Sequence, residues 1–487
     1  MIIVGANFIC PFIGWANEIR PYIFELKSDN QIFMRIFLII KFFFFLVISF
    51  NSLAQGYSIS GRIKGLKDST CYLTYYYENQ NFVQDSSKAS SDGTIVFQGK
   101  MPLKGGMYNV MVGHSQSFDM LIGEQRFSFE ASIKDIFNTI KFFGSRENDL
   151  FYSYQQKTVR DAKRIEELSK KSDTASVSQM YNAQYESVKY KEKFIRAFEN
   201  TFAGKIIKST MASDIPPAPK LADGTEDPLW GNKFFVNHYF DNIDLTDDRL
   251  IRTPFLYQPI KYYFDQLDFL PNDSLIVLTD KFLNKTRKTS EMRKYIVTKL
   301  ANHFETSKII GRDAIFVHLL QKYYINDPLM WDTTTIRLVK ERVKYLKNLL
   351  IGVQVPNLRA SDVNGKERSL YDVKAKNTIL YIYGADCGHC QVFTPQLAKY
   401  IQDNKAKNIE VFAPIFGNNI ETWKAFIKEY KSESFINVID KTGKLNLYQE
   451  FDAQFTPTIY ILDKDKKIIG KGNMSIKLMD EIISSQL

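Results

Sequence analysis

The sequence predicts a multidomain protein with a small all-β N-terminal domain, an α-helical middle domain and a C-terminal α/β domain. The chain has 487 residues, which is too long for one ordinary hydrophobic core. An apolar share of 45%, with 14% aromatic residues, is typical of folded domains rather than of long disordered segments. The hydrophobic period changes twice along the chain, from that of strands to that of helices and then to alternating strands and helices.

The charge pattern argues against one class of partner. The formal net charge of +10 comes from lysines and arginines that are scattered along the chain, often beside acidic residues. The sequence contains no basic stripe with interleaved aromatic residues, which nucleic-acid binding requires. We therefore expect a solvated basic surface and no nucleic-acid partner.

Residues 34–54 have the pattern of a signal peptide. The sequence MRIFLIIKFFFFLVISFNSLAQ contains an apolar run followed by small residues at a cleavage-like site after Ala54. The run from Ile36 to Phe50 has 15 residues, fewer than the ~20 of a spanning helix. We expect export to the periplasm or cell envelope, with peripheral or N-terminal membrane association as the alternative. Because an export signal normally begins a chain, we interpret residues 1–33 as an upstream extension.

Residues 55–147 are predicted to form the β-rich domain. Five segments have the strand pattern and are separated by turn residues: YSISGRIKGL, CYLTYYYENQ, GTIVFQGKM, GMYNVMVG and QRFSFEASI. Cys71 is interpreted as a small buried apolar residue. This domain shows no catalytic motif in the sequence.

Residues 148–350 are predicted to form the helical domain, a spacer or docking unit. Apolar residues recur every three and four positions, as in YNAQYESVKYKEKFIRAFENTF and SEMRKYIVTKLANHFETS. His238, His303 and His318 lack the spacing of paired metal ligands, so we assign them structural roles.

Residues 351–487 are predicted to form the α/β domain. NTILYIYG and NIEVFAPIFG have the pattern of strands, HCQVFTPQLAKYIQDN and IETWKAFIKEYK that of helices, and TIYILDKDKKIIGKG that of a hairpin. Strands separated by such helices indicate βαβ units with a parallel core, here followed by an antiparallel pair and a last helix opening near Ser475.

Two of the four cysteines, Cys387 and Cys390, lie close together in the stretch YGADCGHCQVFTP. A structural zinc site needs further ligands, and the other cysteines are hundreds of residues away. Covalent haem attachment needs a histidine directly after the second cysteine, where Gln391 stands. A structural disulfide would close a very small loop and stabilise the chain little. We therefore expect a redox-active dithiol, with no metal and no cofactor.

The local pattern gives the two cysteines different roles. A strand delivers Cys387 to the start of a helix, where free backbone N–H groups and the helix dipole favour a thiolate, so Cys387 is the expected nucleophile. Cys390, one turn later, is the more buried thiol that resolves the mixed disulfide. His389, when protonated, is expected to stabilise the thiolate further, and a solvent-facing residue with little effect is the alternative.

These features resemble the thioredoxin fold. The resemblance rests on the Cys-Gly-His-Cys sequence between a strand and a helix, on Pro395 and on the dipeptide Thr456-Pro457 before a later strand. It implies that Pro457 is cis and faces the dithiol and that Pro395 kinks the helix. It also implies that the backbone of Thr456 pairs with an extended substrate segment. Thr456 and Pro457 are therefore expected to bind substrate.

The resemblance can be narrowed to one branch. VPNLRASDVNGKERSLYDVKAKNTILYIYG, with an extra hairpin before the core, is similar to the TlpA/ResA-like branch of exported bacterial thioredoxin-fold proteins. The whole chain is similar to multidomain envelope proteins of the Bacteroidetes. This similarity implies a thiol–disulfide oxidoreductase that acts on cysteine-containing proteins and is regenerated by a redox partner protein.

Three positions depart from these relatives. Tyr381 stands where thioredoxins keep a buried acid, and Phe393 where the ResA-like branch often has a glutamate. Asp386 replaces the usual tryptophan before the first cysteine, and its charge opposes the thiolate. Proton transfer is then expected to depend on water, Asp386 or His389, and the direction of the redox reaction stays open.

Two other functions fit parts of the sequence. The first is an envelope binding or assembly protein whose first two domains are the working part. The second is a thiol peroxidase, but the P-x-x-x-T-x-x-C motif of peroxiredoxins needs proline and threonine where this chain has Leu380 and Gly384. The expected enzyme is therefore a thiol–disulfide oxidoreductase.

Overall fold

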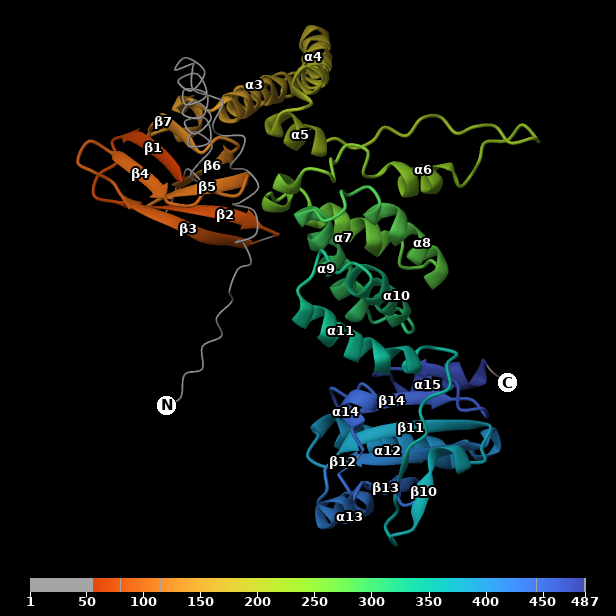
Figure 1. Ribbon diagram of the computed structural model, residues 1–487. Coiled ribbons are helices and arrows are strands. Elements are labelled where there is room, and N and C mark those ends of the chain that lie inside the picture. The colour runs from red at the N-terminus through yellow and green to blue at the C-terminus, as the bar shows by residue number, and fades with distance from the viewer. Residues whose placement is uncertain (1–55, 79, 114–115, 444, 486–487) are drawn as a thin grey trace, which may run out of the picture.

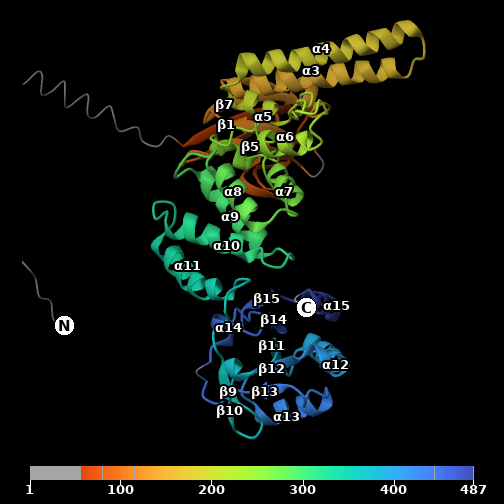
Figure 2. The same ribbon diagram turned by 90° about the vertical axis from the view of Figure 1, so that its right-hand side faces the viewer.

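The computed structural model describes residues 56–485, apart from residues 79, 114, 115 and 444. The predicted signal peptide (34–54) and the segment 1–33 lie outside the described residues. Along the described part of the chain, no helix is long and apolar enough to cross a membrane. The three predicted parts follow one another, and the helices of residues 257–346 lie between the sandwich-forming residues and the C-terminal part in both views (Figures 1 and 2).

The N-terminal part is a sandwich of two sheets. Its strands are β1 (Tyr57–Lys64), β2 (Thr70–Tyr77), β3 (Gln80–Lys88), β4 (Thr94–Gly99), β5 (Gly106–Val112), β6 (Gln116–Ile122), β7 (Arg126–Ser132) and β8 (Lys141–Phe143). One sheet has the order β4-β1-β7-β8 and the other β3-β2-β5-β6. The two sheets meet through apolar side chains such as Phe118 and Phe129, whose ring centres are 5.2 Å apart. The sequence did not predict β3, β6 and β8, all of which are edge strands.

The middle part is helical, as predicted. Its helices are α3 (Arg146–Ser169), α4 (Thr174–Phe198), α5 (Phe202–Ser209), α6 (Trp230–His238), α7 (Tyr257–Gln266), α8 (Asn272–Leu283), α9 (Glu291–Glu305), α10 (Asp313–Leu319) and α11 (Thr333–Leu346). Most begin with a side-chain cap; Ser290, for example, accepts the N–H of Arg293 at the start of α9. Helices α3 and α4 form a long hairpin that extends away from the sandwich (Figure 2).

One hydrophobic core runs from the sandwich into the helical part. Its buried residues extend from Tyr57 in β1 to Leu346 in α11. Because this core is continuous, the sandwich and the helices pack as one unit rather than as two separate cores.

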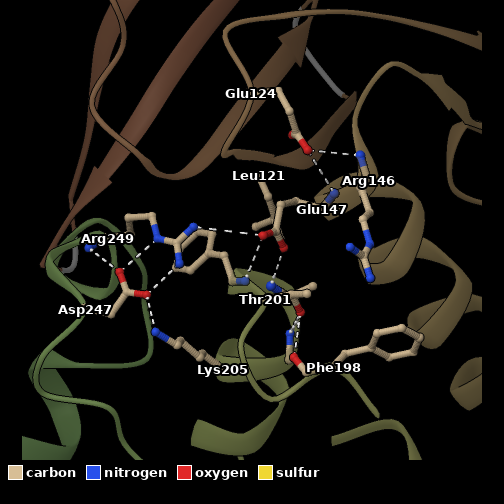
Figure 3. Close-up of polar contacts among 12 residues, drawn as sticks. Leu121, Glu124, Arg146, Glu147, Phe198, Thr201, Lys205, Asp247 and Arg249 are labelled. Carbon is tan, nitrogen blue, oxygen red and sulfur yellow. Dashed lines mark hydrogen bonds and ion pairs between the residues drawn. The ribbon is translucent and has the colours of Figure 1, made fainter.

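A polar cluster at the start of α3 and α5 reinforces this unit (Figure 3). The carboxylate of Glu147 accepts the backbone N–H groups of Phe202 and Ala203 at 2.9 and 2.8 Å. Arg249 lies 4.0 Å from the same carboxylate and makes two hydrogen bonds, of 2.8 and 2.6 Å, to Asp247. The charges of this cluster are thus paired where the helical part meets the sandwich.

The C-terminal part is an α/β domain around a five-stranded sheet of order β13-β12-β11-β14-β15. Its strands are β9 (Arg359–Ser361), β10 (Glu367–Ser369), β11 (Asn377–Gly384), β12 (Ile409–Phe416), β13 (Ile436–Val438), β14 (Thr458–Leu462) and β15 (Ile468–Lys471), and its helices are α12 (Gly388–Asp403), α13 (Ile420–Glu429), α14 (Leu447–Glu450) and α15 (Ile476–Ser484). Strands β11, β12 and β13 run parallel, whereas β14 and β15 are antiparallel, as predicted. The predicted extra hairpin is β9 and β10.

Strand β11 is the centre of this domain because every one of its residues is buried. Apolar residues of α12, α13 and α15 cover the sheet face that carries Tyr381 and Tyr383. The segment before β11 and helix α14 cover the opposite face, which carries Leu380 and Ile382. A strand buried on both faces is rigid, and the residues that directly follow it are held firmly in place.

Candidate functional site

The two close cysteines lie at the junction of β11 and α12. Cys387 is the N-cap of α12, and its Sγ accepts the backbone N–H of Cys390 at 3.2 Å. The Cys387 thiol also donates a 3.1 Å hydrogen bond to the carbonyl oxygen of Thr456. Cys387 is partly exposed, whereas Cys390 is 0% exposed, and both are free thiols. The structure therefore places the predicted dithiol at the expected strand-to-helix junction.

The surroundings of the two thiols separate their acidities. Burial favours the neutral form of Cys387, but hydrogen bonds from Cys390, from Thr456 and from the N–H of His389 outweigh it and lower the pKa of Cys387 below its ordinary value. Burial, together with the neighbouring Cys387, raises the pKa of Cys390 to about 12. This difference favours Cys387 as the attacking thiolate and Cys390 as the resolving thiol.

The loop before β14 faces the dithiol. The peptide bond between Thr456 and Pro457 is cis, as the resemblance implies. Thr456 and Pro457 are both partly exposed, and the Thr456 carbonyl is in direct contact with the Cys387 thiol. An extended segment that pairs with the backbone of Thr456 would thus lie next to the reactive sulfur. The substrate-binding role of the two residues stays a prediction.

Tyrosines fill the space on the buried side of the dithiol. Tyr381 is 0% exposed, and its hydroxyl shares a 2.8 Å hydrogen bond with the hydroxyl of Thr394 in α12. Its ring stacks on that of Tyr383 with centres 5.3 Å apart, and the indole N–H of Trp423 donates to the Tyr383 hydroxyl at 3.0 Å. Burial raises the pKa of both tyrosines well above the ordinary value, so they stay neutral. The uniformly apolar pattern of the strand gives no sign in the sequence that these two hydroxyls are hydrogen-bonded.

His389 and Asp386 point to solvent beside the dithiol. Both are exposed, and neither side chain makes a hydrogen bond or ion pair with another described residue. The contribution of the His389 ring to the thiolate therefore stays a prediction, while its backbone N–H already favours the thiolate. Phe393 packs against Tyr381, with ring centres 5.8 Å apart, and offers no acid. Pro395 lies inside α12, where it was expected.

The histidines of the helical part, for which we expect structural roles, lie far along the chain from the dithiol and contact acidic residues. The imidazole of His318 lies 2.9 Å from a carboxylate oxygen of Asp280, and that of His238 lies 2.7 Å from one of Asp241. No group of three or more His, Cys, Asp or Glu side chains within the described ranges is arranged to hold a metal ion.

Three segments of the chain match known family models. Residues 351–471 match the AhpC/TSA family. Residues 57–151 and 187–348 match two domains of unknown function, DUF4369 and DUF5106.

Curated relatives match the C-terminal part. The thiol-disulfide oxidoreductase ResA of Bacillus thuringiensis is 29% identical over 135 residues, which are 27% of this chain and 76% of that protein. The protein of the same name from Bacillus subtilis is 26% identical over 118 residues, which are 24% of this chain and 64% of that protein.

Solved structures are similar as well. A domain of a possible thiol-disulfide isomerase from Cytophaga hutchinsonii is 38% identical, with 28% of this chain and 93% of that chain covered and a TM-score of 0.27. A thioredoxin-like protein from Bacteroides caccae is 21% identical, with 57% of this chain and 100% of that chain covered and a TM-score of 0.47.

Proposed function

We propose that this chain is an exported enzyme that exchanges disulfides with cysteine-containing proteins of the cell envelope. Its C-terminal domain is a thioredoxin-like domain of the AhpC/TSA family and of its TlpA/ResA-like branch. The domain is that of a thiol–disulfide oxidoreductase. The observation that carries the proposal is the unequal pair of thiols at the start of α12, one partly exposed with a lowered pKa and one buried with a raised pKa.

The reaction follows from this inequality. The Cys387 thiolate attacks one sulfur of a substrate disulfide, and the other substrate sulfur leaves as a thiolate and takes up a proton. Cys390 then loses its proton and attacks the Cys387 sulfur, which releases the second substrate thiol and leaves an enzyme disulfide. The substrate disulfide is reduced and the enzyme dithiol is oxidised by the same two electrons. The reverse sequence oxidises a substrate dithiol.

The departures from related sequences bear on how protons move. Tyr381 is held neutral by burial, so it cannot replace the acid that thioredoxins keep at this position. The resolving thiol has a pKa of about 12 in the reduced protein, so its proton must leave to a base during the exchange. Water that reaches the partly exposed Cys387 is the acceptor we propose, with Asp386 and His389 beside it.

The location and partners of the enzyme are part of the proposal. Export is supported by the signal-peptide pattern of residues 34–54, and no cofactor is needed because the dithiol carries the electrons. A second redox protein must return the dithiol to its starting state after each turnover. The direction of electron flow follows from the reduction potential of the Cys387–Cys390 pair relative to that of this partner.

A pair of matched cysteine variants tests the proposal. We expect Cys387→Ser to reduce insulin no faster than the uncatalysed background. The Cys71→Ala variant, which changes a buried cysteine of β2, keeps the rate. Full insulin reduction by Cys387→Ser contradicts the proposal.

Consumption of hydrogen peroxide in place of disulfide reduction identifies a thiol peroxidase instead. Complementation of a deletion strain by Cys387→Ser would assign the function to the first two parts.

A further inference from the structure

A groove of about 560 Å³ lies between the helical part and the C-terminal domain. On the helical side its wall consists of the loop that follows α9 and of residues of α10 and α11. On the other side it is lined by the loop before β14 and by residues around β15. The groove is therefore built by two parts of the chain that are far apart in the sequence.

The groove is lined by sequence neighbours of Thr456, the residue that contacts the dithiol. Pro457 and Thr458 line it, and the preceding residue, Thr456, accepts the 3.1 Å hydrogen bond from the Cys387 thiol. Phe455 also lines the groove and is 83% exposed, which is unusual for a phenylalanine. A substrate segment held beside Cys387 would therefore continue directly into the groove.

The helical wall presents apolar surface. Ile309, in the loop after α9, is 44% exposed, and the buried residues Phe316 and Leu346 also line the groove. On the opposite wall, Leu478 is partly exposed as well. Exposed apolar side chains on both walls of a groove favour an apolar occupant.

The charged side chains of the groove are mostly neutralised by one another. Arg342 donates to Glu305 at 2.6 Å and lies 4.0 Å from Asp452. Lys471 forms an ion pair with Asp313 across the two parts. Because these charges are paired, the groove is poorly suited to a strongly charged ligand.

The same ion pair fixes the two walls relative to each other. The Lys471 ammonium group, on β15, binds both the Asp313 carboxylate at the start of α10 and the carbonyl oxygen of Leu349. Both side chains of the pair are largely buried, 15% and 24% exposed, so solvent screens the interaction less than at the open surface. The helical wall is thus held in place beside the dithiol.

We propose that the helical part forms the second wall of the substrate groove, and that the groove takes an extended segment of a cysteine-containing protein with bulky apolar side chains next to the cysteine. This inference rests on the proposed function. A segment that pairs with the backbone of Thr456 as an added strand turns alternate side chains to opposite sides. One of these sets meets Phe455 and Ile309, which belong to different walls.

The experiment uses two disulfide-looped peptides that differ only in the residues beside the cysteines. One peptide has leucine and phenylalanine there, and the other has serine. The reduced full chain is mixed with each peptide, and the rate of peptide reduction is measured as a function of peptide concentration. The ratio of the two kcat/KM values reports selectivity and cancels any change in the reactivity of the dithiol itself.

The variants are Ile309→Asp in the groove and Leu329→Asp as its matched control. Leu329 is an 84% exposed apolar residue of the helical part that does not line the groove. We expect the wild type to prefer the apolar peptide. Ile309→Asp lowers this preference about tenfold, the effect of losing the burial of one large apolar side chain. Leu329→Asp leaves the preference unchanged.

A double-mutant cycle with Phe455→Ser tests whether both walls contact the same segment. If they do, the losses of preference caused by Ile309→Asp and Phe455→Ser are not additive. Strict additivity of two substantial losses would mean that the two walls bind independently and would overturn the shared-groove inference.

Three further outcomes overturn the inference in distinguishable ways. If the wild type reduces hydroxyethyl disulfide and both peptides equally well, the groove does not read apolar residues, although the proposed function stands. If it reduces neither peptide nor hydroxyethyl disulfide, the proposed function fails and the inference with it. If Ile309→Asp dissociates a dimer on size-exclusion chromatography while the peptide ratio stays constant, the groove belongs to a second copy of the chain.

Discussion

The backbone N–H of Cys390 donates a 3.2 Å hydrogen bond to the Sγ atom of Cys387, so the reactive sulfur caps the helix that carries its partner. A helix N-terminus stabilises negative charge, and here that charge is the thiolate itself. The same placement buries Cys390 inside the domain, where a thiolate is unfavourable. The first turn of α12 thus makes the Cys387 thiol reactive and keeps the Cys390 thiol buried and protonated.

The first prediction concerns alkylation by iodoacetamide. Because its pKa is lowered, Cys387 becomes a thiolate at a lower pH than an ordinary cysteine, and its alkylation rate rises through that lower pKa as the pH increases. Cys390, with a pKa of about 12, stays unmodified at neutral pH. Peptide mapping by mass spectrometry measures both rates. A Cys387 profile with its midpoint at or above about pH 8.5, the value of a free cysteine, contradicts the assignment.

The second prediction concerns the two exposed charges beside the dithiol. Because a basic imidazole beside the sulfur favours the thiolate, His389→Ala should destabilise the thiolate and make the reduction potential more negative. Asp386→Ala should do the opposite. We expect shifts of about 10 to 30 mV, because solvent and salt screen exposed charges. The potentials are measured by equilibration with glutathione buffers, and shifts of both variants in the same direction contradict this account.

The third prediction concerns the tyrosine that replaces the buried acid. Tyr381→Phe removes one partner of the 2.8 Å hydrogen bond to Thr394 and should cost about 1 kcal/mol of the free energy of unfolding. Tyr371→Phe, which removes a hydroxyl bonded to the Val355 carbonyl, is the control. Urea unfolding measures the cost, and disulfide exchange should fall by less than about threefold in both variants.

The alternative outcome for Tyr381→Phe is equally informative. A loss of exchange rate of about a hundredfold, absent in Tyr371→Phe, would mean that the Tyr381 hydroxyl takes part in proton transfer. The proposed route through water would then be wrong.

The fourth prediction concerns the acid stability of the polar cluster that lies where the helical part meets the sandwich. Burial favours the neutral form of Asp247, but hydrogen bonds from Arg249 and Lys205 outweigh it and hold the pKa of Asp247 well below its ordinary value. A lowered pKa contributes stability that is present above the unfolded-state pKa, about 3.9, and is lost as the pH falls towards the folded-state value.

Asp247→Asn should therefore lower the free energy of unfolding by about 2 kcal/mol at neutral pH. Measured by urea unfolding, the difference from the wild type should shrink at about pH 3, where the wild type has itself lost part of this stability. The exposed Asp465→Asn serves as the control. If Asp247→Asn lowers the free energy of unfolding equally at both pH values, the charge of Asp247 does not stabilise this polar cluster.

The sequence predicted the fold of the C-terminal domain and the place of its two close cysteines because the signals there are local. The fully apolar run of β11 indicates a buried central strand, and the spacing of Cys387 and Cys390 places both thiols on the first turn of a helix. The dipeptide Thr456-Pro457 lies before a strand, and the fold brings it to the dithiol. These features need no knowledge of distant contacts beyond the pairing of the two strands.

The sequence predicted the first two parts of the chain and the groove less completely. The features that it missed depend on which distant part of the chain packs against each element. The edge strand β3 is almost wholly exposed, so it lacks the alternation that identifies a strand. Apolar periodicity shows that a helix has a buried face but not that the sandwich shares the same core. That Ile309 and Pro457 line the same groove has no local sequence signal at all.

The most direct test of the central claim is to trap the mixed disulfide. In a Cys390→Ser variant the resolving thiol is absent, so a substrate that is attacked stays covalently bound. We predict that the trapped adducts map to Cys387 by mass spectrometry and that dithiothreitol releases them. Adducts that form equally well in a Cys387→Ser, Cys390→Ser double variant would contradict the claim that Cys387 is the attacking thiol.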